Sequence, residues 1–249
     1  MSFADAWNYG YLAGYFAEYD QSKYNSMHYL FSTPWIYGVV ICAVIAYLFG
    51  SINCGLLISK IYGTDIRKYG SGNAGATNMT RTFGKKAGIM TFVGDFLKTA
   101  LGLLACRMVF GTEGVFVAGI FCILGHAYPI FFKFKGGKGV VCMAAVVLFA
   151  EPLVFAIMIT IFAIILFGFK MVSFASVMCM VIYPYMLHLI GNWYGAGYGI
   201  HIIYAMMASA LVIFLHRKNI VRIFNHTESK IFQKKDQSSE DDDYEECEE

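Results

Sequence analysis

The sequence predicts an all-α polytopic integral membrane protein with seven transmembrane helices. Of its 249 residues, 58% are hydrophobic and only 14% are charged, whereas soluble domains carry about 25% charged residues. The hydrophobic residues are also gathered into long runs, and a helix needs roughly 20 apolar residues to cross a bilayer. A third observation, the placement of Lys and Arg, predicts which ends of these runs face the cytoplasm.

Seven apolar runs follow one another along the chain. We expect spans at residues 35–60, 86–110, 115–132, 140–150, 153–169, 172–190 and 200–215. The fourth run is short for a crossing helix unless it begins inside the glycines before it. A tilted, a broken and a re-entrant helix therefore remain alternatives for that run.

Basic residues lie in alternate connections between the runs. The connections after the first, third, fifth and seventh runs contain Arg67, Lys68, Arg81, Lys85, Lys86, Lys133, Lys135, Lys138, Lys170, Arg217, Lys218 and Arg222. The opposite connections contain no Lys or Arg. By the positive-inside rule, this pattern predicts an N-terminus outside and a C-terminus in the cytoplasm. Arg107 is an exception near the outer end of the second run, where its long side chain can reach the interface.

The two ends of the chain differ from the membrane domain, which we place at residues 35–224. Residues 1–34 are aromatic and polar, and we expect an interfacial or flexible extension. Residues 225–249 end in a run of acids, which is typical of a disordered, solvated tail. The seven cysteines are scattered, so neither a disulfide framework nor a metal site is predicted, and no cofactor is expected.

A first polar loop interrupts the apolar pattern with the run GSGNAGATNMTR, from Gly70 to Arg81. Glycines allow positive φ and close approach to a ligand, and successive backbone N–H groups can cradle an anion. Polar side chains and an arginine add donors suited to phosphate. We interpret the run as a phosphate-binding loop, with a flexible linker as the alternative. It is neither a dinucleotide fingerprint, because an apolar helix precedes it, nor a Walker A loop, because no G-K-[ST] closes it.

A second loop, GHAYPIFFKFKGGKG from Gly125 to Gly139, combines three lysines with glycines. It can offer backbone N–H groups, a point charge and the start of the next helix to a phosphate. A basic membrane anchor is the alternative, although it explains the lysines better than the glycines. His126 is interpreted either as a catalytic group or as a polar residue that bridges helices.

Two further pairs of residues are each spaced three apart. Asp95 and Lys98 can pair on one face of the second span, either near a site or as a self-neutralising structural pair, because charges at that depth are costly. His216 and Asn219 follow the last span and would share a helical face. For this segment, the alternative is a basic flank that ends the span.

Taken in order, these motifs resemble the bacterial acyl-phosphate:glycerol-3-phosphate acyltransferase (PlsY) family. The resemblance rests on GSGNAGATNxxR at 70–81, GDFLK at 94–98, GHAYPIFFKFKGGKGV at 125–140 and HRxNI at 216–220, and it covers about residues 36–222. It implies a seven-helix enzyme of the bacterial inner membrane whose active site faces the cytoplasm. Such an enzyme moves an acyl group from acyl phosphate to the 1-hydroxyl of glycerol 3-phosphate, which gives lysophosphatidic acid and phosphate for phospholipid biosynthesis.

The resemblance also implies roles for individual residues. The catalytic positions are Ser71, Arg81, Lys138, His216 and Asn219. The substrate-binding positions are Gly70, Gly72, Asn73, Gly75, Thr77, Asn78, His126, Lys135, Gly136, Gly137 and Gly139, with Asp95 and Lys98 in support. The expected partners are the two substrates and membrane lipid, without nucleic acid. Thr99 and Cys142 depart from the family pattern, which usually has Gly and Thr there.

The proton acceptor and the function class each have alternatives. A substrate phosphate, with a second pKa of about 6, is preferred as acceptor over His216 or His126. A transporter of a phosphorylated metabolite would also need basic loops, but it would tend to show internal repeats, which this chain lacks. An acyltransferase with an H-x-x-x-x-D pair is excluded because no His has Asp five residues later. A scaffold that works through its acidic tail is a third alternative.

Overall fold

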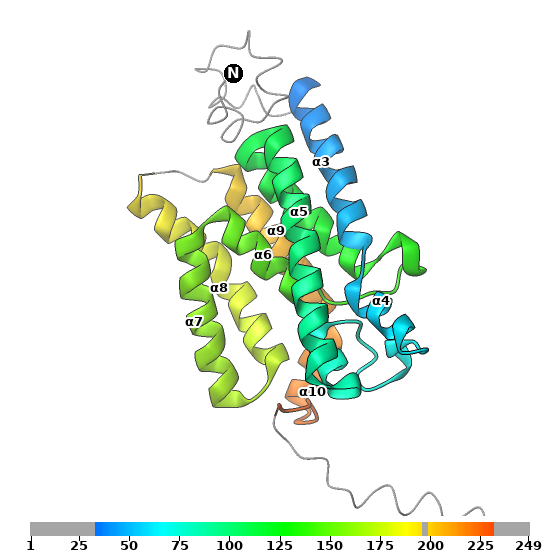
Figure 1. The fold of residues 1–249 in the computed structure, drawn as a ribbon. Coiled ribbons are helices and arrows are strands. Elements are labelled where there is room, and N and C mark those ends of the chain that lie inside the picture. The colour runs from blue at the N-terminus through cyan, green and yellow to red at the C-terminus, as the bar shows by residue number, and fades with distance from the viewer. Residues whose placement is uncertain (1–32, 196–198, 232–249) are drawn as a thin grey trace, which may run out of the picture.

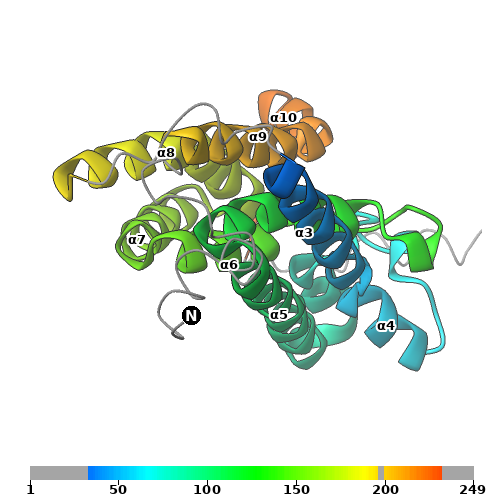
Figure 2. The same cartoon turned by 90° about the horizontal axis from the view of Figure 1, so that it is seen from above.

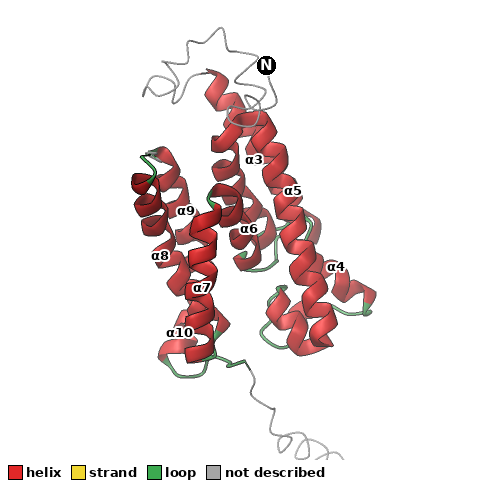
Figure 3. Ribbon diagram, turned by 60° about the vertical axis from the view of Figure 1, so that its left-hand side comes forward, coloured by secondary structure: helices red, strands yellow, loops and turns green. Residues whose placement is uncertain are grey.

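The computed structural model describes residues 33–195 and 199–231, which form a bundle of helices (Figure 1). The described residues contain helices and loops and no strand (Figure 3). The helices are α3 (Thr33–Ser51), α4 (Cys54–Ile61), α5 (Ala76–Ala127), α6 (Val140–Ala150), α7 (Pro152–Phe169), α8 (Val172–Trp193), α9 (Ile200–Leu215) and α10 (Arg217–Phe224). Two short 3-10 turns, η2 (Ile66–Lys68) and η3 (Ile130–Phe132), lie in the two polar loops.

The first predicted span is broken into α3 and α4 at Ile52 and Asn53. The side chain of Asn53 caps α4 by accepting a hydrogen bond from the backbone N–H of Leu56 at 3.0 Å, which satisfies one of the free N–H groups at the helix start. Above the break, α3 packs mainly against α5. A Cβ atom at Gly50 would collide with the backbone of Cys122, so a glycine permits this close approach.

The second and third predicted spans are two arms of α5. A straight helix of 52 residues would be about 78 Å long at 1.5 Å per residue, far more than the roughly 30 Å of a bilayer core. The backbone is not helical at Phe110 and Gly111, where Gly111 has φ 60°. Beyond this turn the two arms are in contact. The contact is so close that a Cβ atom at Gly114 would collide with the carbonyl of Cys106. The chain therefore folds back on itself at residues 110–111.

Four helical stretches among the described residues are long and apolar enough to cross a membrane, and α9 with α10 can form a fifth with a bend of 59°. The four are residues 35–61, 76–132, 152–169 and 172–193. At 11 residues, α6 is shorter, and five of its side chains are buried while the other six are partly buried. The structure thus has the architecture of a multi-pass membrane protein.

Elements from both halves of the chain meet at one end of the bundle. Seen from above, α3, α4 and α5 lie on one side, and α7, α8 and α9 on the other (Figure 2). The start of α5 and the whole of α10 lie at the end opposite to the start of α3 (Figure 1). Residues of the two glycine-rich loops and of α10 face a common space toward that end.

Candidate active site

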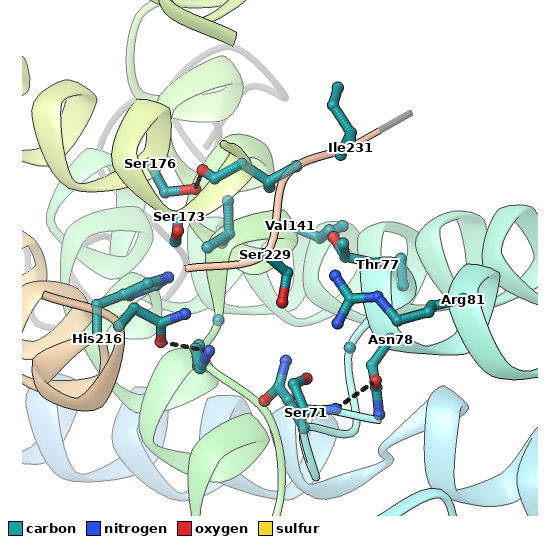
Figure 4. A pocket seen from close by; sticks show the side chains of 18 of the residues that line it. Ser71, Thr77, Asn78, Arg81, Val141, Ser173, Ser176, His216, Ser229 and Ile231 are labelled. Carbon is teal, nitrogen blue, oxygen red and sulfur yellow. Dashed lines mark hydrogen bonds between the residues drawn. The ribbon is translucent and has the colours of Figure 1, made fainter. Parts of the chain in front are cut away.

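A cavity of about 280 Å³ lies between the two halves of the bundle at this end. Figure 4 shows Arg81, Ser71 and His216 around it, from three separate segments. Twelve of the residues predicted to form or support the site line the cavity: Ser71, Asn73, Gly75, Thr77, Asn78, Arg81, Asp95, His126, Lys138, Gly139, His216 and Asn219. The others, Gly70, Gly72, Lys98, Lys135, Gly136 and Gly137, are not part of the lining.

The first loop is held in shape by the buried amide of Asn78. Its Oδ1 accepts a hydrogen bond from the backbone N–H of Ser71 at 2.9 Å, and its Nδ2 donates to the carbonyl of Tyr69 at 3.0 Å. Gly70 and Gly72 take positive φ angles of 57° and 70°, which L side chains rarely adopt. A Cβ at Gly70 would also collide with Asn78. These glycines shape the loop, and Ser71 faces the cavity (Figure 4).

Arg67 joins the first loop to the second. It forms a salt bridge with Asp65 at 2.6 Å, and its Nη1 donates to the carbonyls of Phe132 and Lys135, both at 3.0 Å. The sequence indicated Arg67 as one of several basic residues in its connection, without a role at the site. Lys135, which we expected to bind substrate, has an exposed side chain and contributes its backbone carbonyl to this link.

The second loop places Lys138 in the cavity. The N–H groups of Gly136 and Gly137 donate to the carbonyls of Ala127 and His126, at 2.9 and 3.0 Å. Lys138 then donates to the side-chain oxygen of Asn219 at 2.6 Å. Burial lowers the pKa of Lys138 to about 8, and Arg222 and Arg81 add to this shift, while Glu228 opposes it.

His216 and Asn219 lie together at the junction of α9 and α10, as their spacing predicted. His216 is buried, and its Nδ1 lies 2.8 Å from the carbonyl oxygen of Val212. Because a carbonyl can only accept, Nδ1 carries the proton and Nε2 is left as an acceptor. Asn219 accepts from Lys138 and donates through Nδ2 to Glu228 Oε1 at 2.6 Å.

Glu228 is a site residue that the sequence did not indicate. Its carboxylate accepts hydrogen bonds from Ser173 at 2.6 Å, Asn219 at 2.6 Å and Arg222 at 2.7 Å. Burial raises the pKa of Glu228, but these three hydrogen bonds outweigh burial and lower it overall. The backbone N–H of Ile231 also donates to the carbonyl of Lys170 at 2.7 Å.

The segment that carries Glu228 lies along the cavity. Residues 225–231, which we expected to begin the acidic tail, place Ser229 and Ile231 in the lining (Figure 4). Arg222 could have been predicted from the sequence as a site residue, because it follows Asn219 by three residues on α10. Glu228 could not, because it is one of many acidic residues after the last helix. Residues 1–32 and 232–249 lie outside the described residues, and so does most of the predicted N-terminal extension.

An apolar wall completes the cavity. Its side chains are Phe92, Val140, Val141, Phe162 and Val172, which face the same space as Arg81 and Lys138. Phosphate suits the two cations and the loop N–H groups, whereas an alkyl chain suits the wall. The cavity can therefore accommodate an amphiphilic molecule that carries a phosphate.

Comparisons with known proteins agree with this chemistry. The model of the family described as glycerol-3-phosphate acyltransferase matches residues 40–226. A glycerol-3-phosphate acyltransferase of Bacillus subtilis is 41% identical over 197 residues, which cover 78% of this chain and 97% of the relative. One from Clostridioides difficile is 38% identical over 208 residues, which cover 81% and 99%.

Two crystal structures of PlsY (YgiH), an integral membrane glycerol 3-phosphate acyltransferase, resemble the fold. One is the glycerol 3-phosphate form and the other the lysophosphatidic acid form. Both are 36% identical to this chain and cover 77% of it and 94% of their own length, with TM-scores of 0.69 and 0.68. The chain therefore belongs to the glycerol-3-phosphate acyltransferase family.

Proposed function

We propose that this protein is a membrane glycerol-3-phosphate 1-O-acyltransferase that takes its acyl group from acyl phosphate and serves phospholipid biosynthesis. The observation that carries this proposal is the cavity itself, where two cations and an apolar wall share one space. The names of the relatives support an acyltransferase over a transporter of phosphorylated metabolites. The acyl phosphate donor is supported by the resemblance of the loop motifs.

In the proposed reaction, the 1-hydroxyl oxygen attacks the acyl carbonyl carbon and the bond from that carbon to the phosphate oxygen breaks. The hydroxyl proton ends on the departing phosphate, so no side chain changes its protonation state overall. Phosphate is already a good leaving group, so positioning and charge stabilisation can provide most of the catalysis. Arg81 and Lys138 would stabilise the phosphates, and Ser71 with the loop N–H groups would stabilise the developing oxyanion.

His216 and Asn219 would orient the acceptor. The Nε2 atom of His216 is the acceptor nitrogen, so it can take a hydrogen bond from the hydroxyl of glycerol 3-phosphate. Asn219 holds Lys138 in place through its side-chain oxygen. The remaining polar lining, Asn73, Thr77 and the loop glycines, would complete the phosphate contacts.

We further propose seven spans, with the N-terminus outside and the site facing the cytoplasm of a bacterial inner membrane. The two arms of α5 would count as two spans, and α6 would be a short span within the core. The basic connections support this orientation. A cysteine-labelling experiment with a membrane-impermeant maleimide would test it: a cysteine replacing Lys86 should react only after the membrane is opened.

The activity can be tested with purified protein in detergent. Acyl phosphate and glycerol 3-phosphate together should give phosphate and lysophosphatidic acid in equal amounts. Omitting the acceptor should reduce phosphate release to the rate of hydrolysis, and acyl-CoA in place of acyl phosphate tests the donor. A folded protein that releases no phosphate above background would contradict the proposal.

A further inference from the structure

Three charged or ionisable side chains form a buried cluster beneath the second loop. Lys98 Nζ lies 2.8 Å from Asp95 Oδ1, 3.0 Å from His126 Nδ1 and 3.0 Å from the carbonyl oxygen of Gly50. These contacts use all three donors of the ammonium group. The relative exposures of Asp95, Lys98 and His126 are only 1, 5 and 3%.

This arrangement fixes the tautomer of His126. The carboxylate of Asp95 at 2.8 Å stabilises the charged form of Lys98, and an ammonium group can only donate hydrogen bonds. His126 Nδ1 must therefore accept, which places the ring proton on Nε2. The tautomer of His126 is thus the opposite of that of His216, whose Nδ1 carries the proton and donates to a carbonyl oxygen.

The second loop is built directly on this ring. Gly137 packs so closely that a Cβ atom there would collide with Nε2 of His126, and a Cβ at Gly136 would collide with the carbonyl of His126. That carbonyl also accepts the N–H of Gly137 at 3.0 Å and the side-chain amide of Asn53 at 3.4 Å. The orientation of the imidazole therefore limits where the loop backbone can lie, one residue before Lys138.

A buried ion pair is a poor source of stability, because apolar residues of similar volume often serve as well or better. We propose that Asp95, Lys98 and His126 are positioning residues that fix the conformation of the loop at residues 133–139, and so place the Lys138 ammonium in the cavity. This inference rests on the proposed acyl transfer. For His126, which also lines the cavity, this role is an alternative to the expected roles as a base or a substrate contact.

The ionisation of Lys138 offers a measurement that a purely structural role would not change. The groups that face Lys138 are Glu228, Arg222, Arg81 and His216. Burial is the main cause that lowers the pKa of Lys138. A loosened loop would expose its ammonium group to water, so the pKa would rise and the alkaline limb of kcat/KM would move to higher pH.

The first test neutralises the pair without leaving one buried charge alone, by combining Asp95→Asn with Lys98→Met. We expect kcat/KM per folded molecule to fall at least tenfold and the alkaline limb to move to higher pH. The proposal would be overturned if the folded variant had the kcat/KM of the wild type and the same alkaline limb in its pH profile. If the double variant does not fold, the second test decides.

The second test uses the contact between Gly137 and the imidazole. Gly137→Ala should lower kcat/KM and weaken the calorimetric affinity for glycerol 3-phosphate, because the new methyl group displaces the loop. His126→Asn removes the ring atom that the methyl group meets, while its side-chain oxygen can still accept from Lys98. The double variant His126→Asn/Gly137→Ala should therefore bind glycerol 3-phosphate at least threefold more tightly than Gly137→Ala alone. A double variant no better than Gly137→Ala would overturn the proposal.

These outcomes are separate from those of the proposed function. Wild-type protein that binds glycerol 3-phosphate but transfers no acyl group would remove the proposed reaction. The affinity of the Gly137 variants would still show whether His126 sets the loop. If the wild-type protein is active and the variants behave like the wild type in both tests, only the positioning role is contradicted.

Discussion

Lys138 Nζ lies 2.6 Å from Asn219 Oδ1, in a hydrogen bond between residues 81 positions apart in the chain. The contact connects the second loop to α10 across the cavity. Asn219 is itself held by Glu228, so the position of the ammonium group depends on both halves of the bundle. Removal of any member should thus affect the others.

Lys138→Met should lower kcat/KM by about 100-fold, because a charge-assisted contact to phosphate is worth roughly 1.5–3 kcal/mol. Phosphate release from acyl phosphate and glycerol 3-phosphate measures the effect. Lys86→Met is the matched control, because Lys86 is an exposed lysine on α5 that does not line the cavity. Equal activity of the two variants would show that Lys138 does not act on the substrates.

The activity should fall on the alkaline side as Lys138 loses its proton. Burial lowers the pKa of this residue to about 8, so it is charged below that pH and neutral above it. We expect kcat/KM to decline as the pH rises through about 8, because this ratio reports the ionisation of the free enzyme. The residual activity of Lys138→Met should not show this decline. If the variant still loses activity above pH 8, the decline belongs to another ionisable group.

Glu228→Gln should lower kcat/KM about tenfold, because the neutral amide holds Asn219 and Arg222 less strongly. The folded-state pKa of Glu228 is lowered overall, so the carboxylate stabilises the fold above the unfolded pKa of about 4.3. This stability is lost as the pH falls through the folded pKa. Melting curves of the two proteins should therefore differ at pH 7 and converge in acid. Curves that differ equally at both pH values would contradict the role of the charge.

Asn78→Ala should raise KM about tenfold while changing kcat less. The buried amide closes the first loop at both Ser71 and Tyr69, and its loss leaves these backbone groups without those partners. Steady-state kinetics with each substrate varied in turn would measure the change. They would also show which phosphate the first loop binds, because only that substrate's KM should rise strongly. Thr80→Ala is the control, because its hydroxyl donates to the carbonyl of Ala76 within α5.

Two truncations should behave differently. Deleting residues 232–249 should leave kcat/KM within about twofold of the full chain, because Glu228 and its contacts remain. Deleting residues 226–249 should cost at least tenfold, because Glu228 is removed. A large loss of kcat/KM from the shorter deletion would instead favour the scaffold alternative, in which the acidic tail is the functional part.

The two loops could be predicted because their residues are unusual between apolar runs. Ser71, Arg81 and Lys138 indeed line one cavity. The apolar wall was not predictable, since Phe92 or Phe162 in a membrane helix has the same composition whether it faces lipid or a cavity. The break at Asn53 was also missed, because a polar residue inside an apolar run does not by itself end a helix.

The walls of the cavity come from segments spread along the chain from Ser71 to Ile231, and this has a consequence for biogenesis. The ribosome completes the two glycine-rich loops early, but α10 and Glu228 lie near the end of the described residues and emerge late. A chain whose synthesis stalls between α6 and α9 has Arg81 and Lys138 without Asn219 or His216. Such a fragment would be inert, so only fully inserted molecules would release a detergent-like product into the bilayer.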